Sequence, residues 1–127
     1  MQARNDAVHF GYVFVDCRLT GAPGLTRYVL VRIEPGRFPD SHVAFIHCPI
    51  GDFLSPTGWL LNKVAGAETI APSGRVRFWE FRSTDLAGQP LDVSQRISAS
   101  RQLTPAEAAR MRDVLEVLGG ADQWRPR

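Results

Sequence analysis

Three polar residues hold equivalent places in three similar segments of the sequence, and their types could serve acid–base or metal chemistry. Asp16 follows the apolar run FGYVFV, His47 follows HVAFI, and Glu80 follows RVRFW. A carboxylate beside an imidazole can pass on a proton, and both groups can bind a metal ion. One histidine and two carboxylates do not define a metal site without further ligands, so we interpret them as a solvent-exposed column and expect no metal and no cofactor.

The segments that carry these residues are predicted to be repeated β-strands. The first two copies align when Cys17 is matched with Cys48, and the last two align when Phe45 is matched with Phe78. Each copy is rich in β-branched and aromatic residues, as strands are. A further strand, RYVLVRI, is predicted at residues 27–33. Turn sequences separate the strands: GAPG at 21–24, PTG at 56–58 and PSG at 72–74.

A repeat interval of about thirty residues that contains more than one short strand is typical of one coil of a parallel β-solenoid. In such a fold Phe14, Phe45 and Phe78 would form an internal aromatic stack. Cys17 and Cys48 would be free thiols, because parallel side chains in register strain the torsion of a disulfide. The alternative is a β-sandwich whose apolar strands resemble one another by chance.

The C-terminal segment QLTPAEAARMRDVLEVLGG predicts one amphipathic helix over residues 104–118. Thr104 as N-cap, Pro105 as first helical residue and Glu107 three positions after the cap form a capping box. We expect this helix to cover the body of the domain, with Gly119 ending it and residues 119–127 forming a tail. The predicted apolar stripe of the helix consists of Met111, Val114, Leu115 and Leu118.

The composition is that of a globular protein. The 127 residues, 44% of them hydrophobic, suit a single domain over residues 1–127. The net charge is +2 and the charges are scattered, so we expect no nucleic-acid partner and no binding to an anionic membrane. The first ten residues, MQARNDAVHF, lack the apolar core of a signal peptide, and no apolar run has the length of a membrane span.

Longer stretches of the chain, from about Gly11 to Pro126, resemble the C-terminal part of bacterial pectin methylesterases (pectinesterases) and follow the order found in that family. The resemblance implies an all-β fold, a right-handed parallel β-helix with coils over residues 11–103 and a capping helix. It also implies an extracellular or periplasmic location and a polysaccharide partner, pectin or an oligogalacturonide. The stretches are YVLVRIEPGRFPDSHVAFIHCPIGDFLSPTGWLLN, VRFWEFRSTDLAGQPLDVSQR, SRQLTPAEAARM and VLGGADQW.

The resemblance also implies a reaction, the hydrolysis of the methyl ester of galacturonate units by two aspartates. One aspartate acts as nucleophile and the other as general acid and base. In the family the nucleophile lies in a VDFIFG-like motif before the strand that matches GYVFVDC, and this sequence contains no such motif. Asp16 matches the later strand and inherits neither role. We therefore expect a truncated pectinesterase that does not catalyse the reaction alone.

Three candidate site residues follow from the same resemblance. Arg32, in YVLVR, matches the arginine that orients the nucleophile, and Arg37, in PGRF, is the alternative for that role and a candidate substrate-binding residue. Trp59, in PTGW, matches an aromatic residue of the family's sugar cleft. The alternative interpretations are a solvated arginine at a strand end and a tryptophan packed in the core.

Two other functions remain open at this point. The first is a non-catalytic pectin-binding module that uses Trp59, Arg32 and Arg37. The second is a structural β-solenoid protein that interacts through its ends. A first coil without a neighbour presents unpaired backbone groups, so we expect a homodimer through the exposed N-terminal coil.

Overall fold

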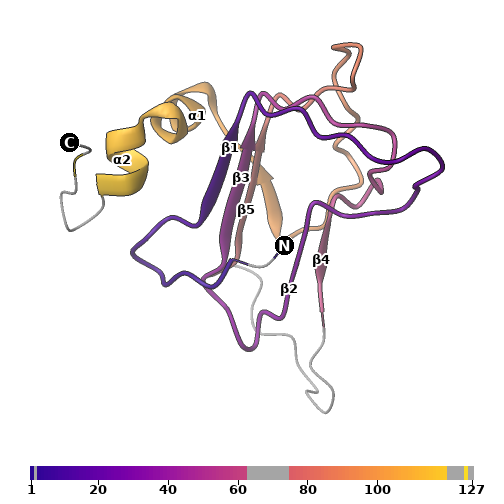
Figure 1. Cartoon of the computed structure of the whole chain (residues 1–127). Coiled ribbons are helices and arrows are strands. Elements are labelled where there is room, and N and C mark those ends of the chain that lie inside the picture. Colours follow the sequence, from indigo (N-terminus) through magenta and orange to yellow (C-terminus); the bar gives the residue numbers. More distant parts are fainter. Residues whose placement is uncertain (2, 63–74, 120–124, 126–127) are drawn as a thin grey trace.

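The described residues of the chain form two parallel β-sheets and two short helices (Figure 1). The structure is a computed structural model, and it describes residues 1, 3–62, 75–119 and 125. The predicted turn at 72–74 and most of the predicted tail at 119–127 lie outside these residues. Figure 1 shows the larger sheet standing between the helices on one side and the smaller sheet on the other.

The larger sheet has four strands, and each pairs in parallel with its neighbour. The order in the sheet is β1-β3-β5-β6. Three of its strands lie inside segments predicted from the repeats, and the fourth was not predicted. The strands are β1 (Tyr12–Val15), β3 (His42–Ile46), β5 (Arg77–Phe81) and β6 (Ser100–Gln102).

The smaller sheet pairs β2 (Val31–Ile33) with β4 (Trp59–Leu61), again in parallel. The strand predicted at 27–33 is therefore shorter than expected, and Tyr28 joins Leu54 only by an isolated bridge. From β1 to β5 the chain alternates between the two sheets. Each time it comes back to a sheet, the new strand pairs in parallel with the previous strand of that sheet. This parallel pairing is compatible with a β-helix-like arrangement and argues against a β-sandwich, whose sheets are antiparallel.

The strand register confirms the first of the two predicted repeat alignments and corrects the second. Phe14 lies opposite Phe45, as the match of Cys17 with Cys48 predicts. Phe45 lies opposite Glu80, and Val43 lies opposite Phe78, so the match of Phe45 with Phe78 is wrong by two positions. Such a shift keeps every side chain on the same face of a sheet, and the alternation of apolar residues could not detect it.

A backbone bend after each of the first three strands of the larger sheet gives an independent check of this register. Asp16, His47 and Arg82 have φ values of 52°, 52° and 49°, in the left-handed region that residues other than glycine seldom adopt. The column of equivalent residues is therefore Asp16, His47 and Arg82. Glu80 does not belong to it but points into the core, as Phe45 does.

The central strand β3 is buried on both faces, as expected for a parallel strand covered from two sides. Val43 and Phe45 face the smaller sheet and share a core with Trp59. Residues on the other face of β3 share a second core with the first helix. This second core consists of Ala44, Ile46, Phe81, Leu103, Ala108 and Met111.

Aromatic rings stack in the first core, although not as the single column that was predicted. Phe14 stacks on Phe45 with ring centroids 4.8 Å apart, as expected. Phe78 instead stacks on Trp59 at 4.7 Å, because it stands two positions away from the predicted register. Cys17 and Cys48 are both free thiols, as predicted. Burial raises the pKa of the Cys48 thiol, which makes it a poor nucleophile.

The predicted capping box is confirmed, but the helix behind it is interrupted. Helix α1 (Pro105–Arg112) begins after Thr104, whose hydroxyl accepts from the Glu107 amide while the Glu107 carboxylate accepts from the Thr104 amide. The chain leaves the helical conformation at Asp113 and resumes as α2 (Val114–Gly119). The Asp113 carboxylate accepts from the amides of the two residues that follow Val114, so it caps a new helix instead of continuing the first one.

The interruption at Asp113 changes which residues the helices bury. Met111 is 5% exposed, as the predicted stripe requires. Val114, Leu115 and Leu118 are 52%, 41% and 53% exposed, so the prediction of one continuous buried stripe is wrong after Met111.

Charge substitutions on the two helices should therefore have unequal effects. Met111→Asp should lower the free energy of unfolding by about 3 kcal/mol or more, because it buries an unpaired carboxylate beneath α1. Leu115→Asp, at an exposed position, should change it by less than about 1 kcal/mol. Urea titrations of the two variants test this expectation, and equal losses would contradict the described packing of the helices.

Candidate functional site

Arg32 lies on the outer face of the smaller sheet. Its side chain is exposed, whereas Val31 and Ile33 on either side of it are buried. Its strand neighbour in β4 is Leu60, which is 43% exposed. A guanidinium group in this position can reach a ligand that lies along the outside of the sheet.

Trp59 lies on the opposite face of the same sheet. Its side chain is fully buried, stacks on Phe78 and donates its indole N–H to a carboxylate oxygen of Glu80 at 3.2 Å. A ring without exposed surface is not placed to stack on a sugar. The described structure thus favours the core-packing interpretation of Trp59 over the sugar-cleft interpretation, and it does not bring Trp59 and Arg32 to one surface.

Arg37 lies in the turn that follows β2. Its backbone amide donates to the Glu34 carbonyl, and its exposed guanidinium lies 5.3 Å from the centroid of the Phe38 ring. The guanidinium of Arg4 lies 4.9 Å from the same ring. Two guanidinium groups therefore lie close to the ring of Phe38.

An almost completely buried ion pair joins Glu80 to Arg96. The Arg96 Nε donates to one carboxylate oxygen of Glu80 at 2.8 Å, and Nη2 donates to the other oxygen at 3.2 Å. Ser83 donates its hydroxyl to Glu80 at 2.9 Å, and the Trp59 indole completes the set of donors. The Glu80 carboxylate compensates the positive charge of Arg96, and Arg96 also donates to the Pro56 carbonyl, which joins two loops.

His42 is a buried, neutral imidazole. Its Nδ1 accepts from the Gly11 amide at 2.9 Å, so the proton of the neutral ring is assigned to Nε2. Nε2 is buried and has no hydrogen-bond partner among the described residues. The ring meets Trp79 edge to face at 4.6 Å, and burial, with a smaller contribution from the charge of Arg77, lowers the pKa of His42 to about 3. His42 is thus part of the packing rather than a proton carrier near neutral pH.

The column of residues at the bends does not form a metal site. Asp16 accepts from Arg112 of α1, and this bond is the main reason that its pKa is lowered. His47 packs edge to face on Phe81. Within the described part of the chain no three His, Cys, Asp or Glu side chains come close enough together to hold a metal ion.

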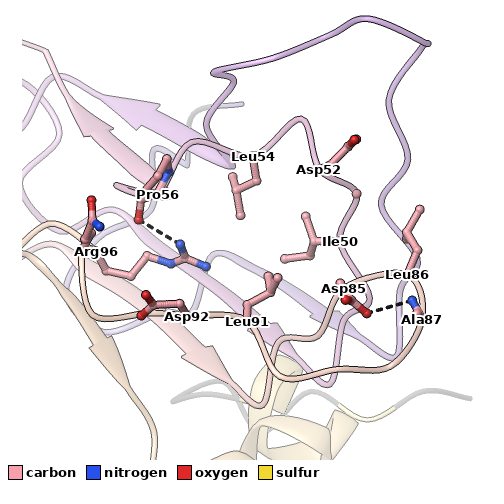
Figure 2. A pocket seen from close by; sticks show the side chains of 12 residues that line it. Ile50, Asp52, Leu54, Pro56, Asp85, Leu86, Ala87, Leu91, Asp92 and Arg96 are labelled. Carbon is pink, nitrogen blue, oxygen red and sulfur yellow. Dashed lines mark hydrogen bonds between the residues drawn. The ribbon is translucent and has the colours of Figure 1, made fainter.

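A pocket of about 620 Å³ opens between the segment that follows β3 and the loop that follows β5 (Figure 2). Its apolar side chains include Ile50, Leu54 and Leu91, which point toward its middle in Figure 2. Twelve residues line it: Ile50, Gly51, Asp52, Leu54, Pro56, Asp85, Leu86, Ala87, Leu91, Asp92, Gln95 and Arg96. No local sequence pattern predicts this pocket, because its walls come from segments that lie far apart in the sequence.

A second, open hollow of about 390 Å³ lies beside Trp79. Its two arginines are engaged in the fold. Arg101 lies 5.2 Å from the Trp79 ring centroid and pairs with Glu107 of α1. Arg77 donates to the backbone carbonyls of Asp6, His9 and Asp40, which ties the N-terminal segment to the sheet. The hollow is therefore a junction between structural elements.

Comparison with known proteins connects this chain to pectinesterases. It is 30% identical over 98 residues to Pectinesterase 2 of Olea europaea and, separately, to a pectinesterase of Parthenium hysterophorus. Each aligned region covers 77% of this chain and 22% of the relative. It is 30% identical over 108 residues to Pectinesterase 1 of Olea europaea, which is 84% of this chain and 25% of that relative. No family model and no solved structure matches.

These similarities support a distant, pectinesterase-like relationship. These relatives are plant proteins, whereas the motifs of the sequence resemble bacterial members of the family. The chain spans between 22% and 25% of the length of the curated relatives it matches. None of the described helices is long and apolar enough to cross a membrane.

The low pKa of His42 predicts a specific loss of stability in mild acid. The unfolded chain takes up a proton near pH 6.5, but the folded chain does so only near pH 3, so the stabilising contribution is complete above pH 6.5 and is lost as the pH falls toward 3. The free energy of unfolding should fall by up to about 1.4 kcal/mol per pH unit in that window. His42→Asn should flatten the slope between about pH 6.5 and 4.5.

The matched control for this measurement is His47→Asn, at the half-buried bend after β3. It should leave the slope unchanged. Denaturant titrations at several pH values give the slope directly, and the same slope in the wild-type chain and in His42→Asn would rule out the proposed origin of the acid sensitivity.

Proposed function

We propose that this chain forms C-terminal coils of a right-handed parallel β-helix of the pectinesterase type, similar to that of the bacterial enzymes, and that it contacts galacturonan without hydrolysing its methyl esters alone. The observation that carries this proposal is the similarity to pectinesterases over 77% to 84% of the chain. The alternation between two parallel sheets supports the β-helix part of it. The polysaccharide ligand in turn favours an extracellular or periplasmic location.

Four of the described carboxyl groups are unsuited to act as the general acid of this reaction. Ester hydrolysis by two carboxylates needs one of them to remain protonated near neutral pH, which requires a raised pKa. Every carboxyl pKa shift found in the described part of the chain is downward. The shifted groups are Asp6, Asp16, Asp92 and Glu107. Glu80, which is fully buried, is held by Arg96 and Ser83 and is closed to a polymeric substrate.

The exposed arginines are the residues that we assign to galacturonan. Arg32 projects from the outer face of β2, where it can pair with a carboxylate of the polymer or orient a nucleophile supplied from outside this chain. Arg37 lies in the exposed turn after β2. It is our alternative to Arg32 as the arginine that orients the nucleophile, and we also assign it a contact with the substrate. Trp59 supports the sheet from its inner face, so its contribution is structural.

The purified chain should release no methanol from highly methylated pectin, because its sequence contains no VDFIFG-like motif to carry the nucleophile of this reaction. The chain should bind polygalacturonate, and Arg32→Ala should weaken this binding several-fold. Added salt should weaken the binding of the unaltered chain as well, because it screens the charges of the arginine and the polymer. Arg110→Ala, on the exposed side of α1, is the control and should leave binding unchanged. Methanol release that disappears in Arg32→Ala would overturn the proposal of a non-catalytic chain.

A second candidate function, self-association, rests on the open edge of the larger sheet. Strand β1 is an edge strand, and the Phe14 ring that stacks on Phe45 is only partly buried. Tyr12, in β1 itself, is 49% exposed. Such an edge favours pairing with another strand, and a second copy of the chain is the occupant that we propose.

The edge of the smaller sheet is partly covered already. The Met1 carbonyl accepts from the Arg32 amide at 3.4 Å, and Ala3 is buried in the first core. Self-association should therefore depend on the β1 side of the molecule.

Tyr12→Lys should shift the chain toward monomers in sedimentation experiments at high micromolar concentration, because it places a charge on the open edge. Leu118→Lys, which changes an equally exposed apolar residue on α2, should have a smaller effect. A wild-type chain that is monomeric and well folded at this concentration would remove self-association as a function.

A further inference from the structure

The pocket in Figure 2 combines an apolar interior with a negatively charged rim. Ile50 is almost fully buried at its base, and Leu54 and Leu91 complete the apolar surface. Its volume of about 620 Å³ falls within the range of sites for small ligands. The interior can bury a short hydrocarbon body, which the hydrophobic effect would favour.

Three aspartates, Asp52, Asp85 and Asp92, lie around this interior. One oxygen of Asp85 accepts from the backbone amides of Ala87 and Gln89, which fixes the loop that forms one wall. Hydrogen bonds from Ser94 are the main cause that lowers the pKa of Asp92, so this carboxylate is ionised near neutral pH.

Among the described residues of the lining, Arg96 is the one cationic side chain, and its charge is already balanced inside the protein. The side chain of Arg96 is 6% exposed and is paired with Glu80, whose carboxylate balances its charge. Its Nη1 donates to the Pro56 carbonyl. The pocket is therefore negative, although the chain as a whole has a net charge of +2.

A negative pocket disfavours an anionic sugar. Galacturonate carries a carboxylate, which the three aspartates would repel. A ligand for this pocket must instead combine an apolar body with a positive head group, and such a site is separate from the arginines that we assign to galacturonan.

We propose that this pocket binds small alkylammonium compounds, with the hydrocarbon chain against Ile50, Leu54 and Leu91 and the ammonium group at the aspartate rim. The apolar contact supplies affinity, and the carboxylates select the positive charge. The inference does not depend on the proposed function, because it concerns a different surface and a ligand of opposite charge.

Titration of the full isotope-labelled chain with three six-carbon probes tests this proposal by NMR. Hexylammonium should shift the amide signals of Gly51, Asp85 and Leu91 in a saturable way at pH 7 and low salt. Hexanol should bind about tenfold more weakly, which corresponds to about 1.4 kcal/mol. Hexanoate should produce no saturable shift, because the rim repels its carboxylate.

Asp52→Asn should weaken hexylammonium binding several-fold, because Asp52 is exposed at the rim. Asp113→Asn is the matched control: it removes the same charge at the junction of the helices, and asparagine also caps helices. It should leave the affinity unchanged. Equal binding of hexylammonium and hexanol, equal losses in the two variants, or no saturable shift with any probe would each overturn the proposal.

Discussion

The buried ion pair between Glu80 and Arg96 is the interaction on which the arrangement of the two sheets depends. Glu80 belongs to the larger sheet, and its carboxylate also accepts from Trp59 of the smaller sheet, so one group links both layers. Arg96 comes from the loop that closes the pocket. Removing either partner would leave the other charge uncompensated in the interior, which costs about 3–5 kcal/mol. The core thus tolerates an inward carboxylate because hydrogen-bond donors satisfy it. These donors come from three separate segments of the chain.

This polar centre and the apolar packing around it have different roles. The stacked rings and the aliphatic side chains of β3 supply the hydrophobic burial, which is not specific for one register. The hydrogen bonds to Glu80 are directional and can form only when Trp59, Ser83 and Arg96 are all in place. A shift of two positions leaves Glu80 on the inward face, so the polar network depends on where Glu80 lies along the sheet, opposite Phe45, and not on the face alone.

Features encoded by neighbouring residues could be predicted from the sequence. The capping box at Thr104 and the positions of three strands follow from local patterns. The break at Asp113 was missed because the apolar spacing continues through it, and only the competing hydrogen bonds of its carboxylate show that a second helix begins. The pocket and the pairing of Glu80 with Arg96 were missed because no local pattern relates residues that approach one another only after folding.

The bends at Asp16, His47 and Arg82 have a consequence for how this chain can change during evolution. Phe14 pairs with Phe45 and Phe45 pairs with Glu80, so the second interval between paired strands is longer than the first. The chain nevertheless leaves the sheet with nearly the same φ each time, and the difference in length is absorbed entirely in the connections between the strands. Insertions and deletions in these connections can therefore accumulate while the hydrogen-bonded ladder stays intact, which gives the surface loops a freedom to diverge that the strands do not share.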